Sequence, residues 1–375
     1  MLRVKRLNGS ENAPPTRTSV KSMGTRLRSS IADPNRKRRA RTAHGAKHMH
    51  ATKSKGKSPA TLEFEVTSMS APPPPVADVE MQDVEPQPSR TKKTYRLPKE
   101  LLRPAFQEIS KETLLSVEPE LGEDLPDIEY IRDAMEELGP GLLRATSSVR
   151  ATPLKDALPS EIAITINDHS DYPPPTHMLA IYPKDVPGNA RRQVTLVPTH
   201  SVVLALHCAR LPKLKASPPT PSYTTEDRTE LVVPIQPLCL PSPAAFSHLS
   251  VFLYTKRADH LLKSLLPCPP PPTLDEDRTQ LPAFAARLAD TYTLQALLLH
   301  VNSVHGLWQN AIVLGVHIDE LWDQIDLAWE VLLSAMAISA RTPHLMLKRP
   351  SALPPAAETA SPAPDPDSAA STPTA

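Results

Sequence analysis

The chain has 375 residues, of which 45 are Pro and only 10 are Gly, and its formal net charge is +1. This much proline favours one folded domain rather than the two that the length allows. The three cysteines, Cys208, Cys239 and Cys268, form no CxxC pair and do not indicate a disulfide framework or a zinc site. Because no apolar run approaches the ~18 residues of a membrane span, we expect a soluble, intracellular protein.

Charge is unevenly distributed over the N-terminal part. Residues 1–60 contain 16 Lys and Arg against 2 Asp and Glu, whereas residues 61–160 contain 11 basic and 19 acidic residues. A cluster in the basic part fits the acidic grooves of a nuclear import receptor, although it can also neutralise nucleic-acid phosphates or simply be solvated. We predict a nuclear import signal, and since no DNA-reading module accompanies it, any nucleic-acid contact is secondary. The cluster is Arg36, Lys37, Arg38, Arg39 and Arg41.

Residues 1–94 carry few aromatic or branched aliphatic side chains and include a run of four prolines. Such a segment cannot bury enough apolar surface to offset the entropy lost on ordering, so we predict that it is disordered. Residues 342–375 are rich in Pro, Ala, Ser and Thr, and we predict a second disordered tail there.

Residues 95–150 form a predicted helical, acidic region. A rough apolar stripe from Leu101 to Leu114 is interrupted at Pro104. A clearer helix begins after Asp127 as N-cap and stops at Gly139-Pro140. Its apolar face packs on the core or docks into a groove of a partner. That face is Ile128, Ile131, Met135 and Leu138.

Residues 151–341 form the predicted α+β interaction domain. Short apolar runs predict strands, and wider apolar periodicity predicts helices. Ser242 is the expected N-cap of one helix, with Pro243 at its first position. The predicted strands are 161–166, 178–182, 194–197 and 231–235, and the predicted helices are 200–209, one after Ser242, 261–266, 284–300 and 318–336.

Two Pro-rich stretches, near 213–229 and 267–282, are predicted surface loops. Ser217 and Thr220 precede prolines in the first of them, and they are candidate phosphorylation sites for proline-directed kinases.

The predicted last helix carries Trp322 and Trp329 on its apolar face. These two side chains are core anchors, or they are anchors of a partner interface, where a few buried aromatic residues supply most of the binding energy.

Motifs of catalysis are missing from the sequence, which contains no GxSxG elbow, phosphate-cradling Gly loop or HExxH. His48 and His50 lack the further ligands of a metal site. His200, His207 and Cys208 fall in a short apolar run where packing is favoured over a ligand or nucleophile role. We therefore expect no cofactor, no metal and no enzymatic activity.

The order strand, helix, strand, helix is found from residue 194 to 255, with a His just before the first helix and a Phe-x-x-Leu-x-x-x-Leu-Tyr helix after the second strand. This order resembles the core of a BTB/POZ domain, a small sheet with packed helices. The acidic residue that such domains carry ahead of the first strand is absent here, where Arg191 and Arg192 stand. We therefore make no prediction that two such domains pair as a homodimer.

Three runs resemble the Clampless family of basidiomycete sexual-development regulators over roughly residues 95–340: HSVVLALHC, PLCLPSPAAFSHLSVFLYTKR and VHGLWQNAIVLGVHIDELWDQIDLAWEVLL. The resemblance implies a regulator of clamp connection formation and of the dikaryotic cell cycle, downstream of the homeodomain mating-type factors. We expect it to act in the nucleus by binding transcription factors or other nuclear proteins. The alternatives are a DNA-binding transcription factor that uses the basic tail and a BTB-type adaptor of a ubiquitin ligase.

Overall fold

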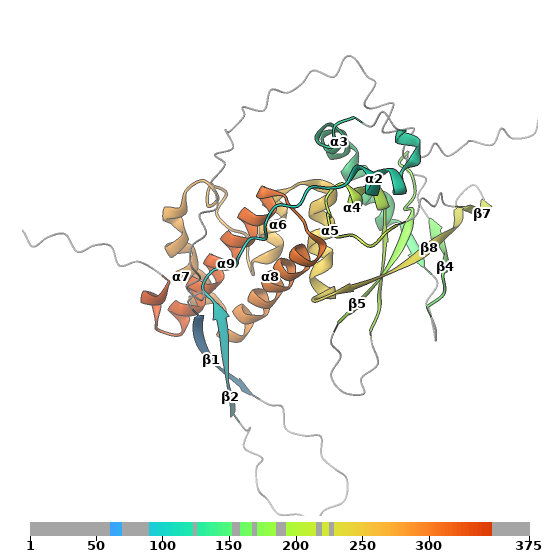
Figure 1. Ribbon diagram of the computed structural model, residues 1–375. Coiled ribbons are helices and arrows are strands. Elements are labelled where there is room, and N and C mark those ends of the chain that lie inside the picture. Colours follow the sequence, from blue (N-terminus) through green and yellow to red (C-terminus); the bar gives the residue numbers. More distant parts are fainter. Residues whose placement is uncertain are drawn as a thin grey trace, which may run out of the picture.

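The structure is a computed structural model that describes residues 61–69, 90–122, 126–151, 158–166, 171–184, 193–214, 220–224 and 229–346. These stretches contain both helices and strands, which confirms the predicted α+β class. The larger sheet with its helices forms one half, and the C-terminal helices form the other half beside it (Figure 1). The disorder predicted for residues 1–60 and 347–375 concerns residues outside this description.

The strands form a hairpin and a larger mixed sheet. The hairpin pairs β1 (Thr61–Met69) with β2 (Arg90–Pro98) in antiparallel register. The larger sheet contains β3 (Val149–Ala151), β4 (Glu161–Ile166), β5 (His177–Pro183), β6 (Thr195–Thr199), β7 (Thr220–Thr224) and β8 (Thr229–Leu240). Its order is β3-β4-β8-β5-β6, and β7 also pairs with β8.

Strand β8 holds this sheet together because it changes partners along its length. Its first part is antiparallel to β4, as far as the pair Glu161 and Pro234. Its second part is parallel to β5, from the pair Met178 and Ile235 onward. The sequence predicted an end at Ile235, and β8 instead runs through Pro237 to Leu240. Past Ile235, β8 pairs only with β5 among the described residues. Because its other edge is unpaired there, β8 can include Pro237, which has no backbone N–H to donate.

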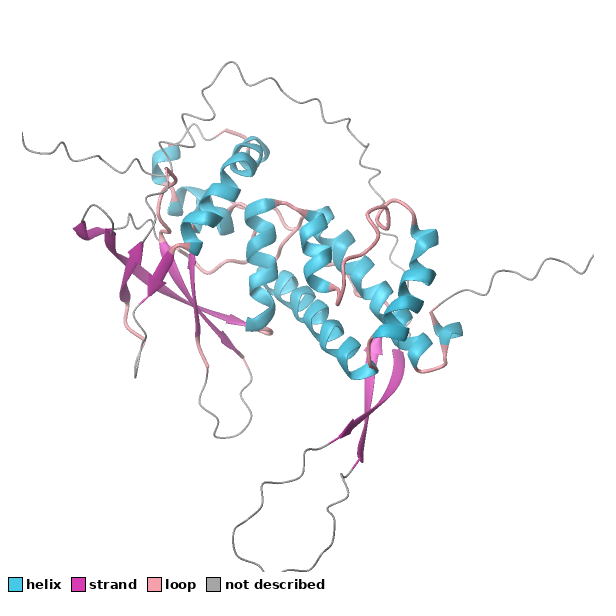
Figure 2. Ribbon diagram, turned by 180° about the vertical axis from the view of Figure 1, so that it is seen from behind, coloured by secondary structure: helices cyan, strands magenta, loops and turns pink. Residues whose placement is uncertain are grey.

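The two faces of the sheet pack differently, as the alternation of side chains in β5 shows. Leu179 and Ile181 join the large core shared with the helices. Met178 and Ala180 point to the opposite face, where they pack in a small separate apolar cluster with side chains of β4 and β8. The helices therefore cover one face of the sheet, as the view from behind also shows (Figure 2).

The helices divide between the two halves. In the sheet half they are α2 (Lys111–Val117), α3 (Ile128–Ser147) and α4 (Ser201–Ala205). In the other half they are α6 (Ala258–Leu265), α7 (Leu281–Thr291), α8 (Leu294–Leu314) and α9 (Asp319–Ser339). Helix α5 (Phe246–Thr255) lies between the halves and packs against α3, α4, α6 and α8. Short 3₁₀ turns are found at 119–121, 243–245, 278–280 and 343–345.

The hairpin β1-β2 corrects the prediction that residues 1–94 are disordered throughout. One face of β1 is apolar at every second position, and Leu62, Phe64 and Val66 are buried. Strand β1 contacts α8, so this face is covered by the helical half of the chain. Composition averaged over 94 residues concealed a short strand whose burial depends on a distant helix.

Helix α3 continues through Pro140, where the sequence predicted a stop. Two features explain the continuation. Gly139 has no Cβ to clash with the proline ring, so the usual bar to a helical residue before proline is relieved. Beyond the proline, Leu142 and Ala145 are buried, and this packing offsets the lost backbone hydrogen bond.

Other boundaries differ because caps and packing define them. The predicted helix 284–300 is two helices, since Thr293 is extended and its side chain accepts a hydrogen bond from Ala296 N–H. Helix α4 is shorter than the predicted 200–209. The apolar stripe from Leu101 to Leu114 is helical only from Lys111, where α2 begins, and residues 101–110 are not helical. Strand β7 lies within the predicted loop 213–229.

Paired substitutions at Gly139 and Pro140 test this account of α3. A Cβ on Gly139 would lie 1.8 Å from the carbonyl oxygen of Tyr254, which is backbone and cannot rotate away. We expect Gly139→Ala to lower the free energy of unfolding by about 3 kcal/mol, at the upper end of overpacking costs. Pro140 is exposed, so Pro140→Ala is expected to be neutral or stabilising. Urea unfolding of both variants measures the difference, and equal losses would contradict the packing argument.

Candidate functional site

Five side chains that the sequence offered for a partner interface are core residues. Helix α3 packs against α5, and α9 packs against α6, α7 and α8. The interpretation as an exposed interface is corrected accordingly, and the alternative of core packing holds. The exposed fractions are 9% for Ile128, 0% for Ile131, 4% for Met135, 2% for Trp322 and 2% for Trp329.

The import cluster from Arg36 to Arg41 and the phosphorylation candidate Ser217 lie outside the described residues. Thr220 is the first residue of β7, and its side chain is also outside the description. Both assignments stay predictions.

An extended segment crosses the helical half of the chain. We call residues 98–107 the strap; it leads from the end of β2 toward α2 and contains neither helix nor strand after Pro98. The strap runs over α9 as a coil between the hairpin and the sheet half (Figure 1). Its contacts come from residues more than 100 positions further along the chain.

Side-chain rings of the helical half bind the backbone of the strap. Each ring N–H donates to one strap carbonyl, so His317 carries its proton on Nε2. This mode of binding does not depend on the side chains of the strap, because every residue offers a carbonyl. The donors and acceptors are Trp329 Nε1 to Pro98 O at 3.1 Å, Trp308 Nε1 to Leu102 O at 3.0 Å, and His317 Nε2 to Ala105 O at 2.7 Å.

Arg103 is the side chain of the strap that selects for charge. Its Nη2 lies 2.6 Å from Asp323 Oδ1 and 2.6 Å from Asp326 Oδ2, and its Nε donates to Asp326 at 2.9 Å. Desolvation lowers the pKa of Arg103, but the bonds to the two carboxylates outweigh it and raise the pKa. Burial raises the pKa of Asp326 although Arg103 opposes this. Asp326 is the more buried partner, so the cost of desolvating its carboxylate offsets part of the attraction between the two charges.

The apolar side chains of the strap face two ways. Leu101 is buried, with 7% exposure, whereas Leu102 and Phe106 are 66% and 75% exposed. The Phe106 ring meets the His317 ring edge-on at 5.2 Å. The strap is therefore held by one apolar anchor, one arginine, three carbonyls and the side chain of Gln107, whose Oε1 accepts from Arg210 Nε at 2.6 Å. Main-chain hydrogen bonds combined with specific side-chain contacts are typical of the recognition of an extended peptide.

Sequence reasoning missed Arg103, Asp323, Asp326 and His317 as parts of one site. The acidic pair at i, i+3 on a helix was visible in the sequence. Its cation lies 220 residues away from Asp323, so no local pattern connects them.

His200 belongs to a hydrogen-bonded core network, as the sequence favoured. Its Nε2 donates to Pro173 O at 3.0 Å, and its Nδ1 accepts from the Tyr254 hydroxyl at 3.0 Å. The same hydroxyl accepts from His200 N–H at 2.9 Å. Burial lowers the pKa of His200 to about 4, so the ring is neutral near pH 7.

A second buried polar group has no such network. Lys256 ends α5 in a left-handed conformation, with φ of 52°, and its Nζ is buried without a hydrogen-bond partner among the described residues. The ammonium lies 5.6 Å from the centre of the Phe252 ring. Burial lowers the pKa of Lys256 to about 7, and Arg132 adds to this. Burial raises the pKa of the nearby Cys208 thiol to about 12, which makes it unreactive.

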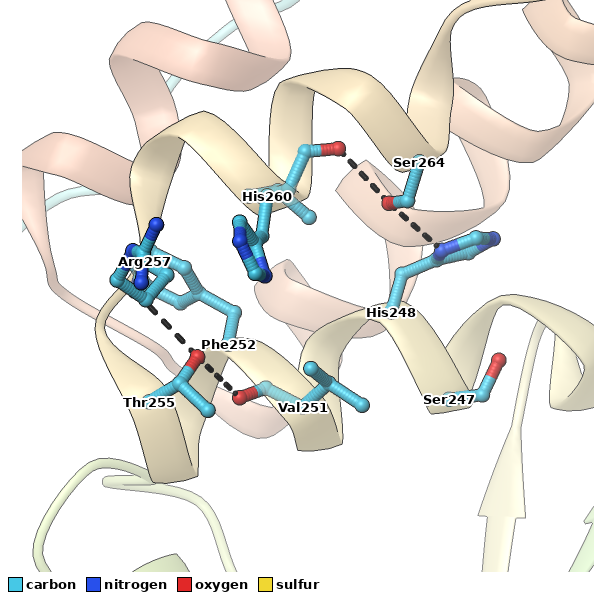
Figure 3. Close-up of a pocket in the computed structure, with 9 residues that line it drawn as sticks. Ser247, His248, Val251, Phe252, Thr255, Arg257, His260 and Ser264 are labelled. Atoms are coloured by element: carbon cyan, nitrogen blue, oxygen red, sulfur yellow. Dashed lines mark hydrogen bonds between the residues drawn. The ribbon is translucent and has the colours of Figure 1, made fainter. Parts of the chain in front are cut away.

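A shallow pocket of roughly 140 Å³ lies between α5 and α6 (Figure 3). Its polar groups bind one another: His248 Nδ1 is 3.0 Å from Ser264 Oγ, and Arg257 makes two bonds to Asp259, at 2.8 and 2.9 Å. Within the described stretches, no group of three or more His, Cys, Asp or Glu is placed to share a metal ion. The strap site is therefore the better candidate.

Comparison with protein families places the two halves in one family. Residues 104–241 match the N-terminal domain of Clampless protein 1, and residues 259–368 match its C-terminal domain. The chain belongs to the Clampless family. No curated protein and no solved structure matches it. The resemblance to this family is confirmed, while the BTB/POZ resemblance of the core stays a prediction.

Membership of the Clampless family indicates a role in clamp connection development. The boundaries of the two family domains follow the halves of the structure, and α5 lies between them. The site on α8 and α9 belongs to the C-terminal domain of this Clampless chain. Among the helices of the described residues, none has the length and apolar character needed to cross a membrane.

The buried amine of Lys256 predicts a pH-dependent stability. Its pKa is about 7 in the folded chain against an ordinary value of 10.5 for lysine, so the unfolded state binds more protons above pH 7 and stability rises with pH. We expect the free energy of unfolding to increase by about 1–2 kcal/mol between pH 7 and 8.5, below the range where Cys208 opposes the trend.

Urea unfolding at the two pH values measures this increase. Lys256→Met should remove it, and the matched variant Lys263→Met, at an exposed lysine of α6, should retain it. An increase that persists in Lys256→Met would assign the effect to another group.

Proposed function

We propose that this Clampless chain is a non-catalytic regulator of clamp connection formation and of the dikaryotic cell cycle, and that it acts in the nucleus by binding other proteins. Its place downstream of the homeodomain mating-type factors, with transcription factors as partners, is part of the proposal. The family supports the developmental role.

The observation that carries the binding mechanism is the strap. The C-terminal domain holds an extended segment by its carbonyls and by one arginine, with Asp323 and Asp326 as receptors. Domains that bind other proteins through short extended segments use these same contacts. His200 and Tyr254, two of the buried titratable groups, are engaged in core hydrogen bonds, which favours a structural role for them over a catalytic one.

The basic run supports the nuclear location. Residues 1–60 carry 16 basic and 2 acidic residues, and the cluster from Arg36 to Arg41 has the composition that import receptors bind. The same charge favours a second candidate, direct contact with DNA, whose signature is a steep dependence of affinity on salt.

The localisation test uses a tagged chain in fungal cells that form clamp connections. Replacing the five basic residues from Arg36 to Arg41 by alanine should shift the protein from the nucleus to the cytoplasm and abolish clamp formation. The matched control replaces Lys53, Lys55 and Lys57, which lie in the same basic segment outside the cluster, and it should stay nuclear. Fluorescence imaging measures the distribution.

Proximity labelling from the same cells tests the mechanism. Nuclear labelling dominated by transcription regulators, lost in the alanine variant, is the expected result. Labelling rich in cullins would replace the proposal with the ubiquitin ligase adaptor. Binding of purified chain to duplex DNA that weakens steeply with salt would favour the DNA-binding alternative.

A further inference from the structure

The strap occupies a site that is built to recognise it, and this raises the question of what else fits there. We propose that the α8–α9 face is a recognition site for an extended segment of a partner protein in which an apolar residue is followed, two positions later, by an arginine. The strap fills this site in cis until such a segment displaces it. The inference rests on the proposed function, since it assumes that the chain acts by binding proteins.

The bound strap shows which chemistry the site accepts. Leu101 supplies the buried apolar side chain, and Arg103, two residues later, bridges Asp323 on one side and Asp326 on the other. Arginine suits this place better than lysine, because its planar guanidinium presents several fixed N–H donors to two carboxylates. The indole of Trp308 binds a carbonyl between them, at Leu102, which any residue provides.

The contacts of the strap are weak enough for exchange. The arginine side chain is 40% exposed, and those of Asp323 and Asp326 are 55% and 36% exposed. Ion pairs so open to solvent contribute little to stability. Leu102 and Phe106 are mostly exposed already, so release of the strap leaves Leu101 as the main apolar side chain to uncover. After Pro98 the strap has no ladder of backbone hydrogen bonds, and segments of this kind open locally.

Both ends of the strap stay attached when it is displaced. Upstream, the hairpin is fixed by Phe64 and Val66, and downstream Ile109 and Leu114 are buried. A tethered segment returns to its site as an intramolecular competitor at high effective concentration. The strap thus lowers the apparent affinity for a partner by the fraction of time that it fills the site. Weakening the strap alone should therefore strengthen binding of a partner segment.

This expectation gives the decisive experiment. The probe is a fluorescein-labelled peptide with the sequence of residues 97–108, and fluorescence anisotropy measures its binding to the purified full chain. Arg103→Ala weakens the strap and leaves the site intact, so this variant should bind the peptide several-fold more tightly than the unmodified chain. The matched control is Arg96→Ala, which removes the same charge from an exposed pair with Glu63 in the hairpin and should bind like the unmodified chain.

Two further variants test the assignment of the site. In the Arg103→Ala chain, the added substitutions Asp323→Asn and Asp326→Asn should reduce peptide binding several-fold. Both carboxylates are partly exposed and uncharged isosteres replace them, so folding is retained, which circular dichroism and thermal melting verify. A peptide with alanine in place of its arginine should show the same loss with the Arg103→Ala chain.

Other outcomes overturn the inference. If Arg103→Ala binds the peptide no more tightly than the unmodified chain, the strap is not a displaceable occupant. If the alanine peptide binds as well as the arginine peptide, the proposed chemistry of recognition is wrong. If light scattering shows a concentration-dependent dimer that the two Asn substitutions abolish, the occupant is a second copy of this chain and not a partner. Failed peptide binding together with normal nuclear labelling would refute this inference alone.

Discussion

The sheet half depends on Tyr254, the residue before the end of α5. Its buried hydroxyl bonds both the backbone N–H and the ring of His200, at the start of α4, at 2.9 and 3.0 Å. Its carbonyl oxygen lies where a Cβ of Gly139 would be, so α3 approaches α5 closely at this point. Three helices therefore meet at a single residue whose hydroxyl makes its hydrogen bonds in a buried environment, where an unmet bond is costly. Burial of the His200 ring lowers its pKa to about 4, so the ring is neutral and its Nδ1 is free to accept the tyrosine proton.

The sheet half and the helical half are joined by hydrogen bonds from a side chain of α8 to the backbone just after β8. Asn310 of α8 accepts from Ser242 N–H at 3.0 Å and donates to Ser242 O at 2.6 Å, which ties the end of β8 to the helical half. Sequence reasoning expected the Ser242 side chain to cap a helix, and the structure instead shows no side-chain cap bond there. Gly306 makes this approach possible, because a Cβ would lie 2.4 Å from Ser242 Oγ. A further link runs from Ala209 and Arg210 to the turn at Gly315. Specific polar pairs in a buried interface allow one arrangement of the two halves. They therefore fix where the α8–α9 face lies relative to the strap.

The strands and helices whose signals are local could be predicted from the sequence, and the rest depended on distant contacts. Strand β4 has the predicted bounds, because its alternation is a property of adjacent residues. The continuation of α3 past Pro140 was not predicted, because it depends on the burial of Leu142 beyond the proline. The strap gave a misleading signal, because its rough apolar stripe indicated a helix, and its partners Trp308 and Trp329 lie 206 and 231 residues away from the carbonyls that they bind. Trp329 was identified as an anchor of the core or of an interface, and it is a core residue whose N–H also holds the strap.

The division between the family domains bears on the role of the strap. The receptors Trp308, Asp323 and Asp326 lie within the C-terminal Clampless domain, whereas Leu101 and Arg103 precede the first matched residue of the N-terminal domain, 104. The site and the anchors of its occupant thus come from different parts of the chain, and only the site is inside a family domain. A purely structural contact would gain from burying both partners, yet Arg103, Asp323 and Asp326 are all partly exposed, so the ion pairs between them add little stability. A segment held by such exposed pairs is better suited to exchange than one that is fixed in the core.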